Sequence, residues 1–171
     1  MTRKRKDAEL CKKVLAWVLF LGISMTIFAF SHQTAQQSSE VSRTVLTQVL
    51  EKLIPGYYEL PEAEQEQLIK TYHSCIRKIA HFGIYTLWGW SLSFLLALYK
   101  KRKKVILGIV LCGGLLYASG DEWHQMFING RAAQLSDIFI DTVGSGFGFV
   151  CFVLLSKIKN YFSKYMKKAL T

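Results

Sequence analysis

Paired cysteines are missing from this 171-residue sequence. The four cysteines stand alone, without a CxxC motif, at Cys11, Cys75, Cys112 and Cys151. Two of them lie inside long apolar runs, where a cysteine behaves as a small apolar residue. The sequence therefore indicates neither a disulfide framework nor a zinc knuckle.

Charge is nearly absent from four long apolar runs, in which His81 and Asp141 are the only charge-bearing side chains. The third run, Val105 to Ser119, would be about 22 Å long as a helix, which is short of the ~30 Å bilayer core. We therefore expect it to continue through Gln125. The pattern predicts an all-α polytopic membrane helix bundle, with four transmembrane helices at about residues 12–31, 79–99, 105–125 and 138–157.

Acidic residues are also scarce, with 12 against 22 Lys and Arg and a net charge of +10. Most of the basic residues lie before the first run, between the second and third, or after the fourth. The positive-inside rule places all three clusters in the cytoplasm, so we expect a multi-pass protein of the cell membrane with both termini cytoplasmic. Such solvated anchors explain the charge without a nucleic-acid partner. The expected parts are a basic leader (1–13), a single membrane domain (14–157) and a basic tail (158–171).

The N-terminus also has features of a signal peptide, with a basic start and a possible cleavage signal at Ala29 to Ser31. Its apolar run is longer than the usual signal core of about 7–15 residues. Cleavage there would leave three spans and an external N-terminus. We expect the run to be retained as the first span.

The segment between the first two spans, residues 31–78, is expected to form two amphipathic outer helices. Apolar residues from Val41 to Ile54 recur at steps of four and five, which makes one helical stripe. Ser38 or Ser39 is expected to cap this helix. Pro55 and Gly56 end it. The second helix starts near Pro61 and runs without proline or glycine toward the second span.

The ionisable residues of the last three spans gather near one side of the predicted membrane. Counting residues along the three helices places these groups within about 10 Å of the outer surface. Because Arg77, His81 and Tyr85 are four apart, they share a helical face. We therefore expect one outer polar pocket for ligand binding, formed by Arg77, Lys78, His81, Asp121, Glu122, His124, Arg131, Asp137 and Asp141, with Tyr85 and Gln125 as hydrogen-bonding neighbours.

Four motifs of this chain resemble the VanZ-like family, which is named for a protein associated with resistance to the glycopeptide teicoplanin. They are RKIAHFGIY from Arg77, DEWHQMF from Asp121, NGR from Asn129 and DIFIDTVGSGFG from Asp137. The segment FSHQTAQQSS after the first span also fits. Many relatives have PGR in place of NGR and an asparagine in place of Asp141. The resemblance implies an integral membrane protein linked to the cell envelope and to antibiotic resistance, but no settled reaction.

Four functions fit the expected pocket. The first is binding of a membrane lipid or a lipid-linked envelope intermediate, with an effect on teicoplanin susceptibility. The second is an enzyme acting on a lipid-linked substrate, with His81 or His124 as general base and Asp121 or Glu122 orienting it. In that enzyme, Arg131 or Arg77 would hold a phosphate.

The third function is a proton-linked transporter, which is disfavoured because the inner halves of the spans hold no ionisable residue. The fourth is a buried ionic network that only fixes helix packing. The histidines match no metal motif such as HExxH, so we expect neither a metal nor another cofactor. Whether the protein is an enzyme stays open.

Overall fold

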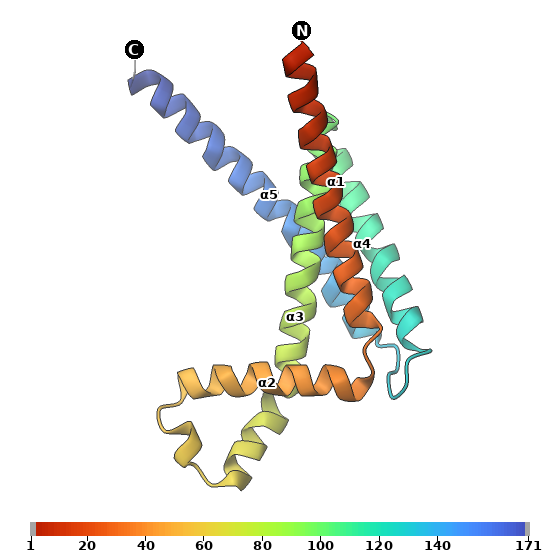
Figure 1. Ribbon diagram of the computed structural model, residues 1–171, viewed down its shortest axis with the longest axis vertical. Coiled ribbons are helices and arrows are strands. Elements are labelled where there is room, and N and C mark those ends of the chain that lie inside the picture. Colours follow the sequence, from red (N-terminus) through yellow and green to blue (C-terminus); the bar gives the residue numbers. More distant parts are fainter. Residues whose placement is uncertain (1–2, 170–171) are drawn as a thin grey trace.

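The computed structural model describes residues 3–169, and every regular element in that range is helical. The bundle consists of α1 (Arg3–Ser31), α3 (Glu62–Leu98), α4 (Lys103–Gln125) and α5 (Leu135–Ala169) (Figure 1). Between α1 and α3 lie α2 (Ala35–Leu53) and the short 3-10 helix η1 (Tyr57–Glu59). The expected all-α architecture is confirmed.

Each of the four bundle helices is long and apolar enough to cross a membrane. The candidate spans are Lys4–Ser31, Glu62–Leu98, Lys103–Gln125 and Leu135–Phe162. Each of the four sequence-predicted spans lies inside one of these helices, except that the second extends one residue further, to the α3 C-cap Tyr99. Most of the basic leader continues into α1, and most of the basic tail is part of α5. Residues 1–2 of the leader and 170–171 of the tail lie outside the described range.

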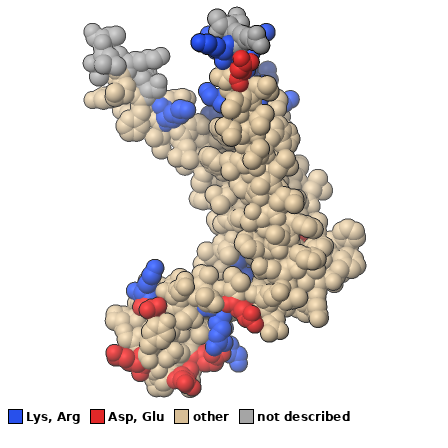
Figure 2. All heavy atoms as spheres, in the orientation of Figure 1, with Lys and Arg blue, Asp and Glu red and all other residues tan. Residues whose placement is uncertain are grey.

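Charged side chains gather at the two ends of the molecule in the view of Figure 2, and the face between them is largely uncharged. One end carries the chain termini, and the other carries α2, which we call the α2 end (Figure 1). An uncharged band between charged ends is the surface expected of helices surrounded by lipid.

Glycines let α3 and α5 pack with their backbones in contact. A Cβ atom added to Gly148 would lie 2.1 Å from the carbonyl oxygen of Thr86, and one added to Gly144 would lie 2.7 Å from that of Phe82. On the facing helix, a Cβ on Gly89 would meet the Ser145 carbonyl oxygen at 2.1 Å. The small-xxx-small spacing predicted to serve packing therefore does so within the chain.

Trp88 ties α3 to both α1 and α4 in the middle of the bundle. Its indole stacks on the Tyr117 ring, with centroids 5.6 Å apart, and its Nε1 donates to Ser24 Oγ at 3.0 Å. The Tyr117 hydroxyl donates to the Ser24 carbonyl oxygen at 2.7 Å. The surrounding core is apolar and includes Leu95 and Val110. These contacts join three of the helices that form the site.

The N-cap of helix α2 lies four or five residues before the two predicted caps. Thr34, rather than Ser38 or Ser39, is the N-cap, and its hydroxyl accepts from the Gln37 backbone N–H. The Gln37 side chain in turn accepts from the Thr34 N–H, which completes a capping box. The prediction missed this start because Ala35 to Gln37 lie outside the apolar stripe used to locate the helix.

Helix α2 runs across the α2 end of the bundle rather than parallel to it (Figure 1). Its Leu46 and Leu50 are buried in a second small core with Tyr57 and Ile69. A salt bridge between Arg43 and Glu66 joins α2 to the first turns of α3. The predicted amphipathic helix is thus packed on one side, and this packing sets its N-terminal half beside the bundle.

Candidate functional site

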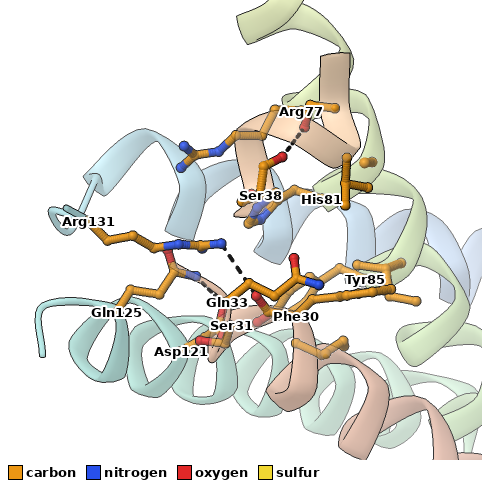
Figure 3. A pocket seen from close by; sticks show the side chains of 15 residues that line it. Phe30, Ser31, Gln33, Ser38, Arg77, His81, Tyr85, Asp121, Gln125 and Arg131 are labelled. Carbon is orange, nitrogen blue, oxygen red and sulfur yellow. Dashed lines mark hydrogen bonds between the residues drawn. The ribbon is translucent and has the colours of Figure 1, made fainter. Parts of the chain in front are cut away.

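A cavity of about 190 Å³ lies at the α2 end, where α1 and α4 finish and α2 begins (Figure 3). Four helices and the loop between α4 and α5 contribute to its walls. Its lining residues are Ile27, Phe30, Ser31, Gln33, Ser38, Val41, Ser42, Arg77, Ala80, His81, Ile84, Tyr85, Asp121, Gln125 and Arg131.

Arg131 reaches the cavity because the loop before it turns sharply. Gly130 has φ +74°, which is a left-handed conformation that glycine adopts without steric cost. The Arg131 N–H closes the turn by donating to the Ile128 carbonyl oxygen at 3.1 Å. The loop is anchored to α2 because the Ala35 N–H donates to the Asn129 carbonyl oxygen at 3.3 Å. The NGR segment therefore acts as a positioning device for the guanidinium.

Two ionic contacts, one helical turn apart, join α3 to α5 beside the cavity. Arg77 Nη2 lies 3.1 Å from Asp137 Oδ2, and His81 Nδ1 lies 3.4 Å from Asp141 Oδ2. Both carboxylates are buried, whereas Arg77 and His81 line the cavity. The acids on α5 thus lie behind the wall and orient the basic groups that form it.

The acids of α4 have separate structural partners. Gln125 Nε2 donates to Asp121 Oδ2 at 3.0 Å, one helical turn away, and both residues line the cavity. Glu122 is buried, and its Oε2 accepts from the Gln134 backbone N–H at 2.7 Å. Glu122 therefore holds the α4–α5 loop, while Asp121 faces the cavity.

Several buried polar atoms in the cavity wall have no hydrogen-bond partner among the described residues. They include the hydroxyls of Ser31 and Tyr85 and the Nε of Arg131. Within residues 3–169, the one side-chain hydrogen bond of Arg131 is long, at 3.4 Å from Nη2 to the Phe30 carbonyl oxygen. Because an unpaired buried donor costs roughly 1–3 kcal/mol, three of them around one cavity are a strong reason to expect a ligand or water there.

The charge of Arg131 is not matched by a salt bridge within residues 3–169. Burial lowers the pKa of its guanidinium below the usual value, and the positive charge of Arg77 lowers this pKa further. Nearby carboxylates, first that of Asp121, oppose the shift. An arginine nevertheless stays protonated, so the cavity holds a partly buried cation close to a second one.

Not every residue expected in the pocket lines the cavity. Those that do are Arg77, His81, Tyr85, Asp121, Gln125 and Arg131. Three expected residues are buried behind the lining side chains and do not line the cavity, namely Glu122, Asp137 and Asp141. Lys78 is exposed and borders a different groove with Cys75 and Phe82. His124 packs against the rings of Phe28 and His32, which also contact each other, and its Nε2 lies 3.4 Å from His32 Nδ1.

The sequence analysis missed the contribution of α1 and α2. Ser31, Gln33 and Ser38 line the cavity and belong to the polar segment FSHQTAQQSS, which resembles a family motif. The pocket was predicted by counting residues along the last three spans to estimate their depth in the membrane. This segment follows the first span, so the count did not include it. Its resemblance to the family was the available signal.

The exposed part of the cavity wall is apolar. Phe30 and Val41 each expose 52% of their surface while lining the cavity, and Ala80 is also exposed. By contrast, Ser31, Tyr85 and Gln125 are almost fully buried. Ile27 is the one buried apolar side chain among the described lining residues, so the cavity has an apolar mouth and a mainly polar interior. No group of three or more potential metal-ligating side chains occurs in the described part of the chain.

Fold and cavity together define a helical membrane protein with a polar cavity at one end of its bundle. The chain belongs to the VanZ/LLP1 family, whose family model matches residues 16–156. The resemblance found in the four sequence motifs is thereby confirmed. No match was found among curated proteins or among solved structures.

Proposed function

We propose that the cavity binds the phosphate-bearing head group of a membrane lipid or a lipid-linked envelope intermediate at the outer leaflet. The observation that carries the proposal is the distribution of the lining side chains, which are apolar at the mouth and mainly polar inside. A water-soluble ligand gains nothing from passing apolar side chains. An amphiphile can leave its chains among lipid beside Phe30, Val41 and Ala80 while its head group enters.

The interior favours an anion with several acceptor oxygens. Among the described residues, the Arg131 guanidinium has no ionic partner, and the hydroxyls of Ser31 and Tyr85 have no hydrogen-bond partner. Arg77 adds a second positive charge at the same cavity. A phosphate accepts from all of these donors at once and relieves the repulsion between the two guanidinium groups.

The cavity is assigned to the outer leaflet because of the distribution of basic residues. The end opposite α2 carries the three basic clusters, which the positive-inside rule places in the cytoplasm. The α2 end, with the cavity, then faces outward. The resemblance to a teicoplanin-resistance protein makes glycopeptide susceptibility the phenotype to measure, because a bound envelope intermediate would be withdrawn from the antibiotic's surroundings.

Lipid analysis of the purified protein tests the proposal. The protein is extracted in a mild detergent, and copurifying lipids are quantified by mass spectrometry against lipids from the same solubilised membranes. We expect a phosphate-bearing lipid to be enriched on the wild-type protein. The Arg131→Ala variant should retain about tenfold less, because a hydrogen bond to a charged group contributes roughly 1.5–3 kcal/mol.

Lys78→Ala is the matched control, since it removes a positive charge one residue from Arg77 but outside the cavity. It should retain the wild-type amount of lipid. Equal enrichment on all three proteins would assign the lipid to the general protein surface and contradict the proposal. Enrichment of neutral lipids alone would contradict the phosphate assignment.

A further inference from the structure

Beyond head-group binding, His81 offers a reactive nitrogen in the same cavity. Its Nδ1 is engaged by the buried carboxylate of Asp141 at 3.4 Å. Its Nε2 has no hydrogen-bond partner among the described residues. This nitrogen is also not fully buried, so it is accessible from the cavity that His81 lines. A histidine held through one nitrogen by a carboxylate, with the other nitrogen free, is arranged as a nucleophile or base.

The neighbours of His81 suit phosphoryl transfer. The transferred group needs positive charge and hydrogen-bond donors around its oxygens, because negative charge on those oxygens dominates the transition state. Arg77 and Arg131 provide the charge, and the buried hydroxyls of Ser31 and Tyr85 provide donors. The carboxylate of Asp141 can stabilise the positive imidazole ring formed when Nε2 bonds to phosphorus.

The cavity contains one histidine, His81, among its lining residues. A second imidazole that would protonate a leaving alcohol is therefore missing from the described lining, and the lining carboxylate of Asp121 is already held as an acceptor by Gln125 Nε2. A leaving group that departs without a proton fits this site better. The terminal phosphate of a lipid diphosphate has such a leaving group, because the departing oxygen belongs to a phosphate rather than to an alcohol.

We infer that the protein hydrolyses lipid diphosphates through a phosphohistidine at His81, a proposal that rests on the head-group binding proposed above. In the first step, the Nε2–P bond forms and the P–O bond to the inner phosphate breaks, which releases the lipid monophosphate. In the second step, water attacks the same phosphorus and the Nε2–P bond breaks. The products are lipid monophosphate and inorganic phosphate, and His81 is regenerated without a net redox change.

The step is tested by trapping the intermediate. Purified protein is mixed with farnesyl diphosphate labelled with ³²P at the terminal phosphate and quenched in alkali, in which phosphohistidine survives. Wild-type protein should retain label that acid treatment removes, and it should release inorganic phosphate. His81→Ala should lose both signals while still binding farnesyl diphosphate in a filtration assay. The control His73→Ala removes a partly exposed histidine of α3 that does not line the cavity, and it should behave as wild type.

Asp141 is inferred to be a positioning residue. Asp141→Asn should lower kcat for phosphate release at least tenfold with little change in KM, because it removes the charge behind the imidazole but no group from the cavity wall. A purely structural role would instead lower the amount of active protein. Farnesyl monophosphate should release phosphate at least tenfold more slowly than the diphosphate.

Each result bears on a distinct claim. Binding of farnesyl diphosphate without label or phosphate release would overturn the catalytic inference and leave the binding proposal standing. Label or turnover that survives His81→Ala would overturn the assignment to His81. Failure of wild-type protein to bind the diphosphate would overturn this inference, and the lipid analysis described above would then decide separately whether another phosphate-bearing lipid occupies the cavity.

Discussion

Arg77 on α3 and Asp137 on α5 form a salt bridge in which Nη2 and Oδ2 are 3.1 Å apart. Four residues further along both helices, His81 and Asp141 repeat the contact. The repeat requires α3 and α5 to share one register, since a shift of either helix would break both contacts. The same pairs leave Arg77 and His81 at the cavity wall, so one arrangement fixes both helix packing and site geometry.

Removing one member of the outer pair should destabilise the protein. Arg77→Ala leaves the buried Asp137 carboxylate without its cation, and we expect a loss of about 3 kcal/mol in the free energy of unfolding. The neighbouring Lys78→Ala should change this free energy by less than about 0.5 kcal/mol. Thermal unfolding in detergent measures both. If the two variants melt together, the salt bridge has no structural role.

Two glycine-to-alanine substitutions, one at a helix contact and one in open space, should have opposite effects on stability. Gly148→Ala places a methyl group against the α3 backbone and should cost about 1–3 kcal/mol, because neither helix can move freely. Gly108→Ala meets nothing within 4 Å, so its higher helix propensity should stabilise α4 by up to about 1 kcal/mol. Denaturation of both variants in the same detergent gives the comparison. A neutral Gly148→Ala would contradict the close contact of α3 with α5.

The natural cysteines provide a test of topology. Cys75 near the α2 end and Cys11 near the N-terminus are both exposed. With the other cysteines replaced by alanine, a membrane-impermeant maleimide should label Cys75 in intact cells. Cys11 should react only after permeabilisation, because the positive-inside rule places the N-terminus in the cytoplasm. The opposite labelling pattern would invert the topology and move the cavity to the inner leaflet.

Arg131 variants distinguish a ligand site from a packing network. Arg131→Ala removes a guanidinium that has no carboxylate partner among the described residues, so the protein should accumulate normally and melt within a few degrees of wild type. Arg131→Lys keeps the charge but loses the planar fork that holds a phosphate with two hydrogen bonds. Both variants should lose most of any effect on teicoplanin susceptibility, measured beside membrane abundance. Loss of the protein itself would favour a structural role.

Much of this architecture could be predicted from sequence, because each span is a local property. Charge-free runs such as Val14 to Phe30 identify the helices, and the basic clusters predict their orientation, which stays a prediction. The i,i+4 spacing of Arg77 and His81 also placed them correctly on one face, since helix geometry fixes that relation within a single element. The start of α2 was wrong because Thr34 acts through a local hydrogen bond that apolar periodicity does not register.

The sequence by itself determined which residues share the depth of the site, because rise per residue converts position into depth. It did not determine which way each side chain faces around its helix axis. Only the packing of α3 against α5, set by glycines such as Gly148, turned Lys78 away from the cavity. Only the crossing of α2 over the bundle brought Ser38 and Val41 to the cavity wall. Rotation and crossing depend on contacts between distant segments, and a single sequence read helix by helix does not contain those contacts.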